Sequence, residues 1–214
     1  MAPILTIFLE DIINQLLGAT DIRLIAPEWP LKKENNQSTN IDWLMIQTSR
    51  KRLIAIELKT DAGSHDNEQA ATYLQLKKRV SDHGAGYLWV DWERIQEASN
   101  LSWKYEYMIR SANSYKGAFS DIRKVEIVYI VPSSMTNKLS TLGFTAYGLK
   151  DLPHTIDSPR NGAWQILRPA FDELDSNRQN APRSLTSEKS TPVEKDDFIP
   201  DGSSLSSASV PSSH

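Results

Sequence analysis

The stretch that decides the fold is IDWLMIQTSRKRLIAIELK, residues 41–59. It contains two apolar runs rich in Ile and Leu, IDWLMIQ and RLIAIELK, separated by the basic turn TSRK. Two such runs joined by a short polar turn predict an antiparallel β-hairpin. With the turn centred near residues 49 and 50, residues whose numbers add up to about 99 face each other. Asp42 is therefore expected to lie opposite Glu57.

Charged side chains end the second strand of this hairpin. Because side chains alternate across a strand, Glu57 and Lys59 point to the same face. Facing carboxylates repel each other, and a divalent cation removes that repulsion. We therefore expect Asp42, Glu57 and the backbone carbonyl of Leu58 to bind Mg²⁺ or Mn²⁺. Lys59 is then expected to orient a water molecule or to stabilise negative charge developing on a phosphate.

The segments around the hairpin predict further helices and strands. Residues 3–18 have apolar side chains at helical spacing, and Gly18 is a typical helix end. Residues 66–84 predict a second helix, which places Gln69 and Tyr73 on one face at i, i+4 spacing. Before the hairpin we expect a strand from residue 21 ending at Pro27 and a polar loop at 32–40. After the second helix we expect strands at 85–92, 124–132 and 143–149, with partial helix at 93–116. A short helix is expected at 162–174, with a kink at Pro169.

This order of elements predicts one α/β domain over residues 1–175, with a mixed sheet covered by helices. From residue 176 the composition changes to Ser- and Pro-rich sequence with few residues to bury. Such a segment cannot form a core, so residues 176–214 are predicted to be a disordered tail.

Composition excludes several classes of site. Among 214 residues there is no cysteine, which excludes disulfides and a Cys nucleophile, and the four scattered His lack helical zinc-site spacing. The net charge of −3 disfavours a protein held to nucleic acid mainly by phosphate contacts, but it does not argue against a nuclease, whose acidic site offsets a local basic surface. The longest apolar stretch is interrupted by Glu10 and Asp11, and no signal-peptide pattern is present, so we expect a soluble cytoplasmic protein.

The motif residues together resemble the PD-(D/E)XK nuclease superfamily, which includes many restriction endonucleases. Asp42 matches the first acidic residue, Glu57-Leu58-Lys59 matches the (D/E)XK element, and Gln69 with Tyr73 matches a Q-x-x-x-Y element of some branches. Over residues 4–92, the expected order is similar to the αβββαβ core of the superfamily. One departure is Ile41, which stands where the superfamily usually has proline.

The resemblance implies a restriction-endonuclease-like fold and a metal-dependent nuclease that hydrolyses phosphodiester bonds, with DNA as the favoured substrate. It implies catalytic roles for five residues: Asp42, Glu57, Lys59, Gln69 and Tyr73. In many members a Glu on the first helix reaches the metal, and Glu10 is the matching candidate. Many members pair to cut both strands, so a homodimer is an alternative to a monomer, and the tail is a candidate for binding a protein partner.

Two other interpretations stay open. In the first, the chain is a catalytically idle relative that serves as a binding or assembly module. In the second, it is an unrelated α/β protein whose hairpin charges form salt bridges on a solvated edge strand. The segment 102–124, where aromatic and basic residues alternate, likewise has two interpretations, because its rings either stack on nucleic-acid bases or belong to the core.

Overall fold

The computed structural model of the protein describes residues 2–32, 38–61, 67–98, 110 and 112–179. The chain divides into two units, residues 1–181 and 182–214, and the fold described is that of the first unit. Its strands are β1 (Ile22–Lys32), β2 (Ser38–Gln47), β3 (Arg52–Leu58), β4 (Lys124–Val131) and β5 (Thr145–Gly148). Its helices are α1 (Ala2–Thr6), α2 (Leu9–Leu16), α3 (Asn67–His83), α4 (Gly86–Ala98), α6 (Thr136–Thr141) and α7 (Asn161–Gln179), with the short 3-10 helices η2 (Lys116–Asp121), η3 (Ser133–Met135) and η4 (Leu149–Asp151).

The strands form one mixed sheet in the order β1-β2-β3-β4-β5. The pairs β1–β2 and β2–β3 are antiparallel, whereas the pairs β3–β4 and β4–β5 are parallel. In the β2–β3 hairpin, Trp43 faces Ile56 and Gln47 faces Arg52, which confirms the register predicted from the turn. The α/β class and the mixed sheet are therefore as the sequence predicts.

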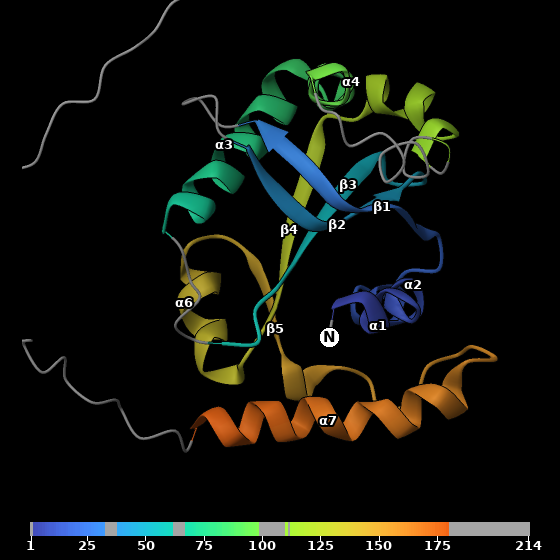
Figure 1. The fold of residues 1–214 in the computed structure, drawn as a ribbon, viewed down its shortest axis with the longest axis vertical. Helices are drawn as coiled ribbons and strands as arrows, with labels where there is room; N and C mark the ends of the chain where they lie inside the picture. The colour runs from blue at the N-terminus through green and yellow to red at the C-terminus, as the bar shows by residue number, and fades with distance from the viewer. Residues whose placement is uncertain (1, 33–37, 62–66, 99–109, 111, 180–214) are drawn as a thin grey trace, which may run out of the picture. The chain divides into compact units, whose positions relative to one another are not determined.

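Helices cover both faces of this sheet, so the unit has three layers (Figure 1). On one face, α3 and α4 pack against β-strand residues in a core that includes Tyr73, Trp89 and Leu53. On the other face, α2 and α7 pack in a second core that includes Ile12 and Phe171. β3 lies between both cores, and its side chains from Arg52 to Glu57 are all buried.

The strand expected at residues 85–92 is wrong, because this segment begins helix α4. Its buried side chains are those of Ala85, Leu88, Trp89 and Trp92. Burial at i, i+3, i+4 and i+7 is the helical pattern, and Val90, which alternation would bury, is 45% exposed. Gly84, with a φ of 82°, ends α3 and reverses the chain into α4. The next strand along the chain is therefore β4.

The expected strand end at Pro27 is also wrong, since β1 continues to Lys32. β1 is an edge strand, with a partner on one side only, and edge strands are where a sheet tolerates proline. Pro27 faces Trp43 and Pro30 faces Asn40 within the ladder. The loop expected at 32–40 is correspondingly shorter, because β2 begins at Ser38, and residues 33–37 lie outside the described part.

Smaller differences concern the helices. The single helix expected at 3–18 is two helices, α1 and α2, and the final helix α7 reaches Gln179, four residues into the expected tail. The rest of the tail lies outside the described residues, as does most of the segment expected to be partly helical beyond α4. The strands expected at 124–132 and 143–149 are confirmed as β4 and β5. No helix within the described ranges has the length and hydropathy needed to cross a membrane.

A buried carboxylate fastens α7 to the end of β4. Asp175 is 3% exposed, and it accepts hydrogen bonds from the backbone N–H of Ser133 at 2.6 Å and from the Ser133 hydroxyl at 2.7 Å. Hydrogen bonds to a charged group contribute about 1.5–3 kcal/mol, and their loss leaves a desolvated donor without an acceptor.

We expect Asp175→Ala to lower the free energy of unfolding by about 2–3 kcal/mol, because both Ser133 donors lose their acceptor. Glu173→Ala removes an exposed carboxylate from the same helix and is expected to change stability by less than about 0.5 kcal/mol. Urea unfolding of both variants measures the difference. Equal losses in the two variants would contradict the anchoring role.

Candidate active site

The site is built around the carboxylate of Glu57 near the end of β3. This side chain is almost fully buried, and a buried carboxylate is strongly unfavourable unless donors surround it. One oxygen accepts a hydrogen bond from the Tyr73 hydroxyl at 2.5 Å. The other accepts one from the Gln69 amide at 2.8 Å and pairs with the Lys59 ammonium at 2.7 Å. Tyr73, Gln69 and Lys59, all predicted site residues, therefore contact the carboxylate of a further one, Glu57.

Helix α3 supplies two of these donors from one face, as the sequence predicts. Gln69 and Tyr73 stand one turn apart, and the Gln69 amide lies 3.3 Å from the Tyr73 hydroxyl. Burial, together with the negative charge of Glu57, raises the pKa of Tyr73 well above its usual range. The phenol therefore stays protonated and serves as a donor to Glu57 at any physiological pH.

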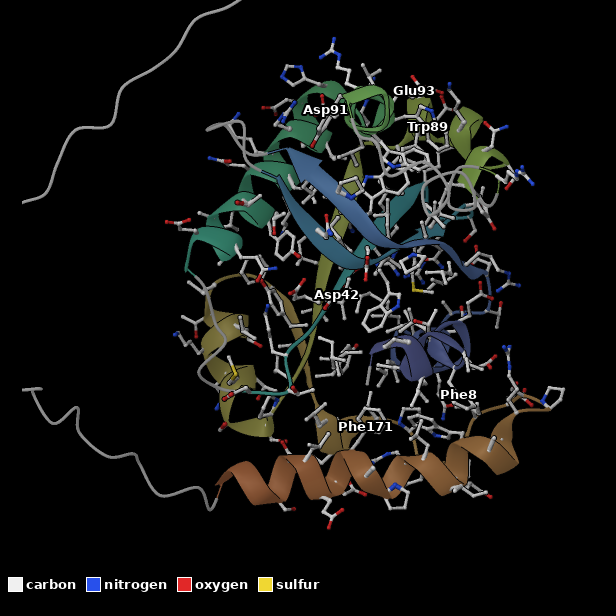
Figure 2. All side chains as sticks on the ribbon, in the orientation of Figure 1. Phe8, Asp42, Trp89, Asp91, Glu93 and Phe171 are labelled. Atoms are coloured by element: carbon white, nitrogen blue, oxygen red, sulfur yellow. The ribbon has the colours of Figure 1, made fainter. Side chains whose placement is uncertain are left out.

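Asp42 stands beside this cluster on β2. It lies one residue beyond Trp43–Ile56, the last pair of the β2–β3 ladder. There its side chain, in place of a backbone carbonyl, accepts a hydrogen bond: Oδ2 lies 2.7 Å from the Leu58 nitrogen. Burial, followed by the negative charge of Glu57, raises the pKa of Asp42 to about 6 despite that hydrogen bond. Figure 2 places Asp42 near the middle of the view, away from the labelled second-core residues Phe8, which precedes α2, and Phe171 on α7. The predicted proximity of Asp42 and Glu57 is therefore confirmed, and their charges repel.

Lys59 follows directly after β3 and links the cluster to solvent. Its N–H donates to the carbonyl of Ile130 on β4 at 2.9 Å, which fixes the backbone at this point. Its side chain is 16% exposed, whereas that of Glu57 is 4% exposed. The ammonium group also lowers the pKa of Asp42, although more weakly than burial raises it. The ammonium of Lys59 thus contacts the buried Glu57 carboxylate and is still partly accessible to an incoming ligand.

The structure does not bring Glu10 to Asp42 and Glu57. Its Oε1 accepts a hydrogen bond from the Leu24 N–H at 2.8 Å, where the β1 register shifts by one residue. Glu10 instead lines a cavity of about 760 Å³ whose lining includes neither Asp42 nor Glu57. In the described part of the chain no group of three or more His, Asp or Glu side chains is close enough to hold a metal, so the expectation that Glu10 completes the metal site is not met.

Glu28 is a neighbour of the site that sequence reasoning missed. It lies between the ladder pairs Pro27–Trp43 and Trp29–Ile41, across from Asp42, and its charge contributes to the raised pKa of Asp42. Its φ of 50° is unusual for a residue other than glycine. The sequence carries no signal for it, because Pro27 predicts the end of the strand one residue earlier.

Asp42 and Glu57 form a donor set that suits a hard divalent cation. Mg²⁺ is commonly bound by only one or two carboxylates, with water and substrate phosphate as the remaining ligands. A carboxylate has about four acceptor positions, and Glu57 uses three of them. Asp42 uses Oδ2 for Leu58, and the mutual repulsion of the two carboxylates favours a cation between them. The Leu58 carbonyl as a further ligand stays a prediction.

Comparisons with protein-family models, with curated proteins and with solved structures find no match to this chain. The resemblance to the PD-(D/E)XK superfamily therefore rests on the motif residues themselves, and the function it implies is a proposal.

The raised pKa of Asp42 predicts an unusual pH dependence of stability. A carboxyl group whose pKa in the folded state is about 6, above its usual 3.8, contributes stability below pH 4 that is lost as pH rises through 6. Asp42→Asn removes this titration and retains an acceptor for the Leu58 N–H. We therefore expect the melting temperature of Asp42→Asn, relative to wild type, to be higher at pH 7 than at pH 4.

Thermal unfolding at the two pH values, without divalent cations, measures this shift. Exposed Asp121→Asn is the matched control and should show no such gain. A difference between wild type and Asp42→Asn that is independent of pH would contradict the prediction.

Proposed function

We propose that the protein is a metal-dependent nuclease that hydrolyses phosphodiester bonds, with DNA as the favoured substrate. The observation that carries this proposal is the convergence of five side chains at the end of β3: Asp42, Glu57, Lys59, Gln69 and Tyr73. Each was identified from the sequence by motif spacing, and three separate elements bring them together.

The energetics of the cluster support a functional role. The chain buries one carboxylate and places a second beside it, partly buried and with a raised pKa. Such an arrangement is expensive, and apolar residues of similar volume often stabilise a protein at least as well as buried charges do. Perturbed carboxyl groups of this kind are typical of catalytic and metal-binding sites.

The order of the elements also supports the proposal. Helix α2, strands β1 to β3, helix α3 and strand β4 follow one another along the chain, with α4 inserted before β4. With β4 in place of the strand expected at 85–92, this order is similar to the αβββαβ core that the resemblance implies, which supports the proposal. The proposed catalytic residues lie on β2, at the end of β3 and on α3.

Each residue has a distinct task in the proposed reaction. A divalent cation would act as a Lewis acid and lower the pKa of a bound water. Asp42 and Glu57 would hold it through carboxylate oxygens. Gln69 and Tyr73 fix the Glu57 carboxylate by hydrogen bonds, and the ammonium of Lys59 can donate to the attacking water or to a phosphate oxygen.

We expect Asp42→Asn to reduce Mg²⁺- or Mn²⁺-dependent nicking of supercoiled DNA by about 10²–10³-fold, because a carboxylate proposed to hold the cation is lost, and with it part of the cation's stabilisation of developing charge. At pH 7 its melting temperature should not fall below that of wild type. Lys59→Met should reduce nicking by about 10²–10⁴-fold while cation binding, measured by calorimetry, is retained. Lys150→Gln, an exposed substitution, is the control.

Loss of nicking together with a large loss of stability in Asp42→Asn would instead favour a structural role for the hairpin charges. A wild-type protein that binds no divalent cation, with or without DNA, would favour the idle binding module.

A further inference from the structure

A second feature lies at the other end of β3 and has a charge opposite to that of the active site. A cavity of about 510 Å³ opens between α3, the start of β4 and the start of β5. We call it the basic cavity. Its polar lining includes Arg52, Lys77, Ser81, Arg123, Lys124 and Glu126.

The positive charges of this cavity are only partly compensated. Arg52 forms an ion pair with Glu126, so these two cancel. The Lys77 ammonium donates to a backbone carbonyl before β5 at 3.1 Å, which leaves its charge in place. Within the described ranges, neither Arg123 nor Lys124 has an ion-pair partner. Three uncompensated cations thus face one cavity on a chain whose net charge is −3.

This arrangement differs from the rest of α3. Lys78 pairs with Asp82 at 2.5 Å, and Arg79 pairs with Asp91 at 3.8 Å. The cations of α3 that point away from the cavity are therefore neutralised by neighbouring carboxylates, and Lys77 is the one directed into it without such a partner.

Arg123 is exposed, and its guanidinium lies against Gly84, which has no side chain to displace it. Gly84 also has a φ of 82°, which other residues rarely adopt. A planar guanidinium without a carboxylate partner is suited to an anionic ligand that accepts several hydrogen bonds, and phosphate is the best match among common anions.

Helix α3 connects the basic cavity to the active site. Gln69, Tyr73, Lys77 and Ser81 follow one another at i, i+4 spacing, the first two at Glu57 and the last two at the cavity. In the β3–β4 ladder, Lys124 faces Arg52, five residues before Glu57. At about 3.3 Å per residue this separation is roughly 17 Å along the strand, about five base-pair steps of a DNA duplex, and the odd number of residues puts Arg52 and Lys124 on the opposite face of the sheet from Glu57.

We propose that the basic cavity binds a backbone phosphate of the polynucleotide whose scissile bond lies at Glu57. The inference rests on the proposed function. Lys77, Arg123 and Lys124 supply the positive charge, and the hydroxyl of Ser81 is a further donor. A contact of this kind holds the substrate without reading its sequence, and it offsets the repulsion between DNA and the carboxylates of the active site. Free phosphate presents the same oxygen acceptors and is the alternative ligand of the basic cavity.

The test uses the full chain and a fluorescently labelled DNA duplex of about 30 base pairs, long enough to span both sites. Anisotropy titrations with Ca²⁺ in place of Mg²⁺ compare wild type, the double variant Arg123→Gln/Lys124→Gln, and the exposed control Lys150→Gln over a range of salt concentrations. The double variant should bind about tenfold or more weakly at 0.1 M salt, and the slope of log K against log salt should fall by roughly one to two. Lys150→Gln should change neither quantity appreciably.

Equal weakening by Lys150→Gln, an unchanged slope in the double variant, or no duplex binding by wild type would overturn the inference. Calorimetric binding of inorganic phosphate that the double variant loses, with duplex binding unchanged, would assign the cavity to free phosphate and overturn the backbone contact. The readout is separate from cleavage. A wild type that binds through the cavity but never nicks DNA contradicts the proposed nuclease, whereas nicking with an unchanged salt slope contradicts the cavity.

Discussion

The rest of the site depends on burial of the Glu57 carboxylate between the sheet and α3. Taking this charge out of water is unfavourable unless several donors surround it, and each donor then has to be fixed in place. Tyr73 and Gln69 reach it because α3 packs with one face on the end of β3, and Lys59 reaches it from just beyond the strand, which ends one residue after Glu57. Asp42, held by the Leu58 N–H, adds a second charge that these donors leave partly unbalanced.

The two ends of the sheet solve the problem of buried charge in different ways. At the start of β3, a continuous chain of contacts crosses all five strands or their ends, from Asp21 through Gln47, Arg52 and Glu126 to Thr145. In this chain each charge has a partner within the protein. At the end of β3, burial and the charge of Glu57 raise the pKa of Asp42, so the negative charges there are not fully compensated by donors of the protein. Perturbed carboxyl groups of this kind are typical of sites that bind a cation or another ligand.

Several features could not be read from the sequence because they depend on neighbours distant along the chain. Residues 85–92 contain enough apolar and aromatic side chains for either a strand or a helix, and burial of Leu88 and Trp92 against the sheet selects the helix. Pro27 stops a central strand but not an edge strand, and its edge position is a property of the sheet. Glu10 lies on the first part of the chain, as the resemblance implies, but its carboxylate accepts a hydrogen bond from the backbone N–H of Leu24, where the register of β1 shifts.

The sequence by itself determined the hairpin, its register and the nearness of Asp42, Glu57 and Lys59, because short turns fix strand pairing and side-chain alternation then fixes which residues share a face. Gln69 and Tyr73 joined the candidate site only through the resemblance to the superfamily. The sequence likewise determined that Gln69 and Tyr73 act together, since i, i+4 spacing is local to one helix. Only the tertiary structure decided which helix face meets β3, that β4 lies parallel beside it, and that Lys77, Arg123 and Lys124 gather at one cavity. These placements join segments far apart in the chain, and they follow from packing of the whole core, which no local pattern specifies.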